Sequence, residues 1–399
     1  MRQDKAAELL GVDERELEEF QAHDPYNDND LAGFICKRGD HRYGALVICA
    51  VNGKKTPLQL VYATPKLHYP FGKDKMTAER KYHWPALKKA NVYEKFDGTN
   101  ICAYSYANAS GMRYVTFKTR LTPVLRESQF GNFKGMWDEM ISRYPGLRRP
   151  DAVYSGDFSL SFELYGYRNP LLIEYPIPLE AVLLFGVQQS DAQVIPGSVL
   201  KARGACPEAF SPVAQVEHSV GRREDITAVY NKLREDALKR NKKTDEGKIV
   251  GSEGFVFYVL TADSTWQMFK AKSEDIEAVH WASDSIHPNS VLTTVWNALE
   301  NVDVDGLTPK YVAELLAEEF SDIQIQKSMD RVKKSIATVK SVVAFRVQVA
   351  EHLKTVPCEL NFDLYRKTIM RHMSQFFDKK DMRKVFTAIK ELGYVETGL

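Results

Sequence analysis

The stretch EKFDGTN, residues 94–100, lies between the apolar runs VY and ICAYSY. Asp97-Gly98 between two apolar strands is a strong signal for a tight hairpin turn. The same stretch also forms a Lys-x-Asp-Gly motif, in which Lys95 would be a nucleophile. Taken alone the motif favours the hairpin, because three fixed residues recur by chance in a chain of 399 residues.

Four further motifs follow in a fixed order and reverse that preference. They are SFELYG (161–166), LLFGV (183–187), SEGF (252–255) and FKAK (269–272). Together with Lys95, this ordered set resembles the motifs of covalent nucleotidyltransferases, the superfamily of polynucleotide ligases and capping enzymes. The element Lys118-Thr119-Arg120 resembles an additional basic motif of RNA ligases.

Within that superfamily the chain most resembles the tRNA-repair RNA ligase of T-even phages, over roughly residues 60–282. The glutamate motif continues as FELYGYRNPLLIEYPIPLEAVLLFGV, with the family's Asn-Arg pair reversed as Arg168-Asn169, and the last motif continues as EGFVFYVLTADSTWQMFKAKSEDIEAVHWA. The resemblance implies an α+β fold: an antiparallel-sheet nucleotidyltransferase domain followed by an all-helical C-terminal domain. It implies an ATP-dependent RNA ligase that joins 5′-phosphate and 3′-hydroxyl RNA ends through a lysyl-AMP and an RNA-adenylate.

The chemistry gives the lysines a reason. An amine attacks phosphorus only when it is neutral, and nearby cations together with burial favour the neutral form. Residues two apart in a strand share a face, so Lys270 and Lys272 would converge on one phosphate beside Lys95, while Phe269 and Ala271 pack behind. The alternative for this pair is a surface strand edge decorated with lysines.

Two glutamates are the candidate metal ligands. Charge on the transferring phosphate is usually balanced by a divalent cation, here Mg²⁺ or Mn²⁺. Glu253 is the first choice to hold it, directly or through water, and Glu163 would share the metal or accept a hydrogen bond from a ribose hydroxyl. Alternatively, each glutamate is a solvated strand residue. Both lie in apolar runs, however, where an unpaired carboxylate is costly.

The resemblance also implies the remaining nucleotide contacts. Phe185 is either a core side chain or a platform that stacks on adenine, and the backbone at Glu94 helps read the purine. Arg120 has a planar fork suited to a phosphate or ribose, and Lys66, beside Pro65, is a weak candidate for the γ-phosphate. The full nucleotide-binding set is Lys66, Glu94, Lys95, Asp97, Gly98, Asn100, Lys118, Arg120, Glu163, Phe185, Glu253, Lys270 and Lys272.

Hydrophobic spacing outlines two domains, residues 1–275 and 276–399. Leu9, Leu10, Leu17 and Phe20 suggest an amphipathic helix within residues 1–25, with Asp13 as a cap inside it, and Asn52-Gly53 predicts a hairpin. Strands rich in β-branched and aromatic residues recur from about 90 to 272, and the charged stretch 232–248 favours a solvated helix and loop. Helices follow, one capped at Thr308-Pro309, one with apolar residues spaced from Met329 to Val343, and one that ends at Gly393.

Composition leaves the function open. A net charge of +1 neither requires nor excludes nucleic acid, and five scattered cysteines without CxxC spacing argue against disulfides or a zinc site. No apolar run is long enough to span a membrane, and we expect a cytoplasmic protein. A DNA ligase and a GTP-dependent capping enzyme remain as alternatives, although both usually append a β-barrel after the last lysine motif. A non-catalytic RNA-binding protein is a further alternative.

Overall fold

A computed structural model of the chain places most of the sequence. It describes residues 3–38, 40–73, 80–126, 133–148, 157–169, 173–203, 212–221, 224–244, 249–273, 276, 286, 288–299, 301–317, 320, 322–358 and 360–392. Contacts divide the chain into one unit within residues 1–282, which is rich in strands, and a second, helical unit from residue 283 onward.

The N-terminal helix is shorter than predicted. Helix α1 (Gln3–Leu10) ends at Gly11, whose φ of +63° is a left-handed helix stop. Asp13 does act as a cap, but of the short 3₁₀ helix Glu14–Glu16. Leu17 and Phe20 belong to strand β1 (Leu17–Asp24), where a spacing of three puts them on opposite faces, each buried in a different apolar cluster. The helix-like spacing therefore came from a strand that buries one of these two side chains on each face.

A four-stranded antiparallel sheet forms the N-terminal part, in the order β1-β2-β3-β4. Its other strands are β2 (Asn29–Cys36), β3 (Leu46–Val51) and β4 (Lys54–Val61). The Asn52-Gly53 hairpin is confirmed, and both residues have the positive φ that such a turn needs. One face of this sheet packs on Tyr104 and Tyr106 of the next sheet.

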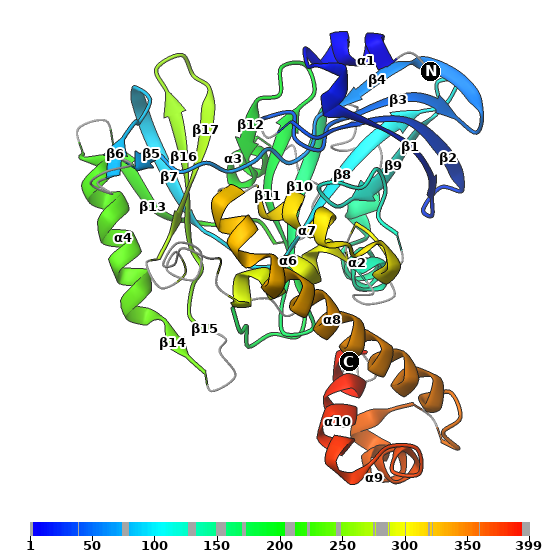
Figure 1. The fold of residues 1–399 in the computed structure, drawn as a ribbon. Helices are drawn as coiled ribbons and strands as arrows, with labels where there is room; N and C mark the ends of the chain where they lie inside the picture. The colour runs from blue at the N-terminus through cyan, green and yellow to red at the C-terminus, as the bar shows by residue number, and fades with distance from the viewer. Residues whose placement is uncertain are drawn as a thin grey trace. The chain divides into compact units, whose positions relative to one another are not determined.

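The second sheet has five strands in the order β12-β11-β10-β8-β9 (Figure 1). Helix α2 (Phe133–Arg143) covers one face through Met136, Trp137 and Met140. Helix α3 (Gly197–Ala202) packs against β11. The strands are β8 (Thr99–Ala107), β9 (Arg113–Lys118), β10 (Phe158–Tyr165), β11 (Glu180–Gln188) and β12 (Val194–Pro196).

The third sheet is four-stranded, in the order β13-β7-β16-β17. Its strands are β13 (Val216–Gly221), β7 (Leu87–Glu94), β16 (Gly254–Thr261) and β17 (Trp266–Lys272). Helix α4 (Ile226–Arg240) covers one face of this sheet (Figure 1). Two short strand pairs complete the unit, β5 (Phe71–Lys73) with β6 (Arg80–Tyr82) and β14 (Lys242–Lys243) with β15 (Ile249–Val250).

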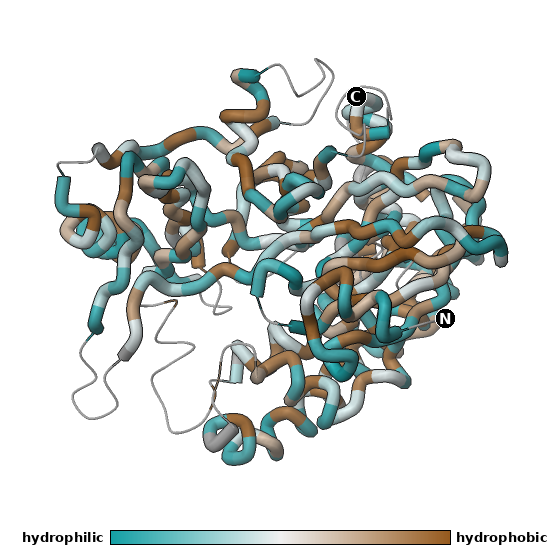
Figure 2. The backbone as a smooth tube through the Cα atoms, turned by 90° about the horizontal axis from the view of Figure 1, so that it is seen from above, coloured by the Kyte–Doolittle hydropathy of each residue, from teal (hydrophilic) through white to brown (hydrophobic). Residues whose placement is uncertain are grey.

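The predicted hairpin at Asp97-Gly98 does not form. Strand β7 ends at Glu94 in the third sheet, and β8 begins at Thr99 in the second, so the strands on either side do not pair. The residues between them carry the chain from one sheet to the other. Apolar side chains such as Phe185 and Tyr258 fill the space between the two sheets. In Figure 2 brown, hydrophobic stretches of the backbone alternate with teal, hydrophilic stretches along the chain.

The second unit is helical, as predicted. Its elements are α6 (Pro288–Ala298), the 3₁₀ helix Val304–Gly306, α7 (Pro309–Leu316), α8 (Asp322–Leu353), α9 (Phe362–Met373), the 3₁₀ helix Lys379–Asp381 and α10 (Met382–Glu391). Thr308 caps α7 by accepting a hydrogen bond from the Tyr311 amide, with Pro309 in the first turn. Helix α8 contributes Val339 to one apolar core and Val349 to another. The predicted stop at Gly393 lies outside the described residues.

The described cysteines, Cys36, Cys49, Cys102 and Cys358, are all free thiols, and the first three are buried. Cys206 lies outside the described residues. Within the described part of the chain, no helix is both long enough and apolar enough to cross a bilayer.

Candidate active site

Lys95 follows directly after the last residue of strand β7, which belongs to the third sheet. Its amide donates a hydrogen bond to the Gly254 carbonyl (2.9 Å), and Gly254 pairs with Lys272 on β17. Lys95 and Lys272 therefore occupy one row across the sheet, with Gly254 between them. Gly254 has a φ of +134°, and an added Cβ would lie 2.1 Å from the Ala271 carbonyl oxygen, so only glycine fits.

Glu253 joins the two lysines of that row. The Lys95 ammonium donates to Glu253 Oε2, and Lys272 Nζ lies 3.2 Å from Oε1. All three side chains are largely buried, with 19%, 8% and 6% of Lys95, Lys272 and Glu253 exposed. Burial opposes ionisation of Glu253, but the charges of Lys95 and Lys272 outweigh it and lower the pKa of the carboxyl.

Lys270 lies two residues before Lys272 on β17, and therefore on the same face of the strand. Its ammonium lies 4.7 Å from the centre of the Tyr69 ring, and its amide donates to the His68 carbonyl. The segment that holds Lys66 thus runs beside β17. Burial lowers the pKa of His68, and the charges of Lys66 and Lys270 lower it further.

Glu163 faces the same group from strand β10 of the second sheet. Its Oε1 accepts a hydrogen bond from the Gly98 amide (3.1 Å). Burial raises the pKa of Glu163 to about 7; Lys95 and Arg120 act to lower it, and Glu253 acts to raise it. The nucleophile candidate and both glutamates therefore interact across the junction of the two sheets.

The residues after Lys95 hold the crossing between the sheets in place. Asp97 accepts a hydrogen bond from the Ile173 amide, while its own amide donates to the Tyr175 hydroxyl. The Asn100 side chain donates to Ser161 Oγ (2.8 Å) and accepts from Thr64 Oγ1 (2.7 Å). These hydrogen bonds stay within the protein, so they shape the backbone around Lys95.

The basic element after β9 divides into two different environments. Lys118 is fully buried, and its ammonium donates to the carbonyls of Gly44, Thr119 and Arg120. Burial lowers the pKa of Lys118 to about 8. Arg120 is partly exposed, lies 5.9 Å from the centre of the Tyr43 ring, and its charge acts on Glu163. The charge of Arg120 therefore acts on Glu163, while the Lys118 amine donates to the Arg120 carbonyl.

Phe185 and Glu94 lie at the margins of the cluster. Phe185 is buried between the sheets, with its ring 6.3 Å from that of Tyr258. Glu94 pairs with Phe255, so its side chain shares the face that α4 covers. Burial raises the pKa of Glu94, and the charge of Glu217 adds to that rise. The Glu94 side chain therefore points away from the lysines, whereas its backbone adjoins Lys95.

Sequence reasoning missed the residues that brace this cluster. Asn169, of the reversed pair, is buried and donates to Thr99 Oγ1 and to the Leu164 carbonyl, whereas Arg168 pairs with Glu139 on α2. Tyr230 and Arg234 of α4 contact the backbone of β17. Their spacing of four residues on a helix was the available signal, but the charged sequence around them obscured it.

The two glutamates fit a divalent cation. Within the described residues, no three His, Cys, Asp or Glu side chains gather into a metal-binding group. Burial is the main cause of the raised pKa of Glu163, and the negative charge of Glu253 adds to it, so the two carboxylates repel one another. Carboxylate oxygens are the ligands that Mg²⁺ and Mn²⁺ prefer.

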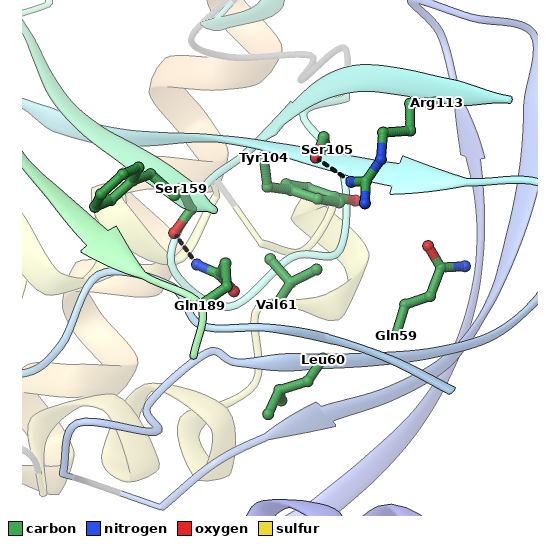
Figure 3. A pocket seen from close by; sticks show the side chains of 9 residues that line it. Gln59, Leu60, Val61, Tyr104, Ser105, Arg113, Ser159 and Gln189 are labelled. Carbon is green, nitrogen blue, oxygen red and sulfur yellow. Dashed lines mark hydrogen bonds between the residues drawn. The ribbon is translucent and has the colours of Figure 1, made fainter. Parts of the chain in front are cut away.

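A separate hollow of about 210 Å³ lies where β4 passes strands β8 to β10 (Figure 3). Gln189 donates to Ser159 Oγ and Arg113 to Ser105 Oγ at its wall. Ser159 precedes Glu163 by four residues on β10, which is about 13 Å along a strand. The hollow is thus distinct from the lysine and glutamate cluster.

No protein-family model and no curated protein matches the sequence. An archaeal ATP-dependent RNA ligase, form 2, is 14% identical, with a TM-score of 0.45 over 87% of this chain and 83% of that chain. A putative ATP-dependent DNA ligase from Aquifex aeolicus is 12% identical, with a TM-score of 0.42 over 94% and 89%. The Naegleria gruberi RNA ligase with PPi is 14% identical, with a TM-score of 0.33 over 56% and 66%. Because these TM-scores are low, the inference about function rests on the site.

Proposed function

We propose that the protein is an ATP-dependent RNA ligase that works through AMP bound covalently to Lys95. The observation that supports this most is the Glu253 carboxylate, which holds the amines of Lys95 and Lys272 together in a largely buried cluster. Lys270 extends the positive charge along β17, and Glu163 faces it from the neighbouring sheet. A cluster of this kind suits a reaction in which an amine attacks a phosphate.

In the first step the neutral Lys95 amine attacks the α-phosphorus of ATP. The Nζ–P bond forms, the bond to the β-phosphate oxygen breaks with its electron pair, and the amine proton passes to solvent. Lys270 and Lys272 stabilise the negative charge that develops on the phosphate oxygens. A divalent cation held by Glu163 and Glu253 would add further positive charge there.

The next two steps use the RNA ends. A 5′-phosphate oxygen attacks the AMP phosphorus and breaks the bond to Lys95, which regains its proton. The RNA 3′-hydroxyl oxygen then attacks the activated 5′-phosphorus. The phosphodiester bond forms, the bond from that phosphorus to AMP breaks with its electron pair leaving on AMP, and the hydroxyl proton passes to solvent. Arg120, whose charge acts on Glu163, is the residue we assign to a phosphate or ribose near this centre.

The helical character of the chain beyond β17 favours RNA over the other substrates of the superfamily. The described residues after Lys272 form helices, with no strand among them, whereas DNA ligases and capping enzymes usually carry a β-barrel there. The test is direct. Sealing of nicked DNA but not RNA would identify a DNA ligase, and labelling from GTP rather than ATP would identify a capping enzyme.

The decisive experiment is incubation with α-labelled ATP and magnesium or manganese, followed by denaturing electrophoresis. We expect an acid-labile labelled band for the natural protein and none for Lys95→Ala. Lys95→Arg is the matched control, because arginine keeps a positive charge opposite Glu253 but does not form the adenylate. A folded natural protein that takes up no label with either metal would favour the non-catalytic RNA-binding alternative and refute the ligase proposal.

A further inference from the structure

One face of helix α4 carries a buried arginine that the sequence did not predict. Arg234 lies in the charged stretch expected to be solvated, yet only 2% of it is exposed. Tyr230, one turn earlier on the same face, is fully buried. Burying a cation costs free energy unless the cation is hydrogen-bonded. The hydrogen bonds of Arg234 therefore indicate which part of the protein helix α4 contacts.

These two side chains bind the backbone of the lysine strand. The Tyr230 hydroxyl donates to the Lys270 carbonyl (3.1 Å), and Arg234 Nε donates to the Lys272 carbonyl (2.6 Å). Strand β17 is the last named strand of its sheet, and along its outer edge the described residues form one isolated bridge, between Phe269 and His68. The helix supplies donors to two alternate carbonyls, which belong to the two lysines themselves.

The residue that ends α4 extends the same pattern to the glutamate. Asn241 Oδ1 accepts from the Ser252 amide (2.8 Å), and its Nδ2 donates to the Ser252 carbonyl (3.1 Å). Nδ2 also lies 3.2 Å from Ser273 Oγ. Ser252 precedes Glu253 and Ser273 follows Lys272, so α4 also fixes both segments where they meet.

We propose that Tyr230 and Arg234 are positioning residues for Lys270 and Lys272. This inference rests on the ligase function proposed above. Neither side chain is assigned a contact with substrate. Each donates to the backbone carbonyl of one lysine and so fixes the position and direction of that lysine side chain. Negative charge develops on the phosphate oxygens in the transition state. A small displacement of a lysine from those oxygens therefore lowers the reaction rate more than it weakens nucleotide binding.

The test compares two tyrosines of the same aromatic cluster, Tyr230 and Tyr82, each of which donates a hydrogen bond to a group outside that cluster. Tyr230→Phe keeps the ring and removes the hydroxyl that donates to the Lys270 carbonyl. Tyr82→Phe removes a bond to Asn231 of the same helix and leaves β17 untouched. We expect Tyr230→Phe to slow single-turnover labelling about twofold to tenfold with little change in KM for ATP, and Tyr82→Phe to leave the rate unchanged. The proposal is overturned if both variants slow labelling equally, or if neither variant slows it.

A double-mutant cycle separates positioning from general stability. If Tyr230 acts through Lys270, Tyr230→Phe has no further effect in a Lys270→Ala background, whereas a structural role slows both backgrounds alike. Arg234→Lys in a Lys272→Ala background gives the parallel test, with an expected loss of about tenfold to hundredfold only when Lys272 is present. Slowing in both backgrounds refutes the inference alone, while absence of label from the natural protein refutes the ligase function and this inference together.

Discussion

At position 98 a β-carbon would lie 2.3 Å from the carbonyl oxygen of Leu164. The glycine is therefore required where the segment before β8 passes close to Leu164 on β10, and its amide donates to Glu163 Oε1. We predict that Gly98→Ala destabilises the protein by about 1–3 kcal/mol and abolishes labelling, because the backbone between Lys95 and β8 must shift. Urea unfolding and ATP labelling measure the two effects.

Gly72→Ala is the control for that change, since among the described residues beyond its two chain neighbours no atom lies within 4 Å of a β-carbon there. It should alter neither stability nor labelling. If Gly98→Ala folded and labelled like the Gly72 variant, the crossing between the sheets would tolerate more movement than the packing indicates.

Lys118 gives the protein a pH-dependent stability term. Burial lowers its pKa to about 8 in the folded chain from 10.5 for the exposed side chain, so between these values the folded state binds fewer protons than the unfolded state. Stability from this residue therefore rises as pH increases from about 8 to about 10.5, by about 3 kcal/mol at most. Urea unfolding of the natural protein and of Lys118→Met across that range should show this rise only in the former. A parallel dependence in both proteins would contradict the assignment.

At the scale of elements, the caps predicted from sequence can be tested one at a time. Thr308 accepts a hydrogen bond from the Tyr311 amide at the start of α7. Replacing it with alanine should cost about 1 kcal/mol, because one amide of the first turn loses its partner. Thr308→Ser keeps the hydroxyl and should cost much less. Chemical denaturation followed by circular dichroism compares the two, and equal losses would show that the hydroxyl does not stabilise the helix.

The elements that sequence predicted well are those fixed by local chemistry. Asn52-Gly53 readily takes positive φ, and the apolar runs on either side of it pair directly. Asp97-Gly98 carries the same kind of signal, yet its flanking strands join different sheets. Local sequence specifies that two strands exist and that the chain bends between them. Which strands pair depends on packing between sheets, which no local pattern contains.

The same limit explains the candidate site. Alternation along FKAK put Lys270 and Lys272 on one face, and the register of β17 places them there. Glu253 forms ion pairs with Lys95, which lies 158 positions before it, and with Lys272, which lies 19 positions after it. Sequence spacing could not reveal these contacts. Arg234 was hidden for a related reason: a charged sequence reads as solvated until the strand that it binds is known.

For the whole molecule, the division into two units makes a prediction that separates stability from chemistry. The lysines and glutamates of the candidate site all lie in the unit within residues 1–282, whereas the fully buried Ile389 lies in the helical unit. Ile389→Ala should therefore lower the stability of the helical unit by about 2–5 kcal/mol through the cavity it leaves. The initial rate of ATP labelling should stay at the natural value, measured below the unfolding transition.

Ile101→Ala is the matched change in the other unit. Ile101 is equally buried and lies on β8 next to Asn100, against the helix-covered face of the second sheet. A cavity of the same chemistry there should lower stability by a similar amount and also slow labelling, because β8 supports the crossing that carries Lys95. Hydrogen exchange locates the loss of protection in each variant. Suppose that Ile389→Ala slowed labelling as much as Ile101→Ala at equal residual stability. Formation of lysyl-AMP would then depend on the helical unit, and the strand-rich unit alone would not suffice for the first step.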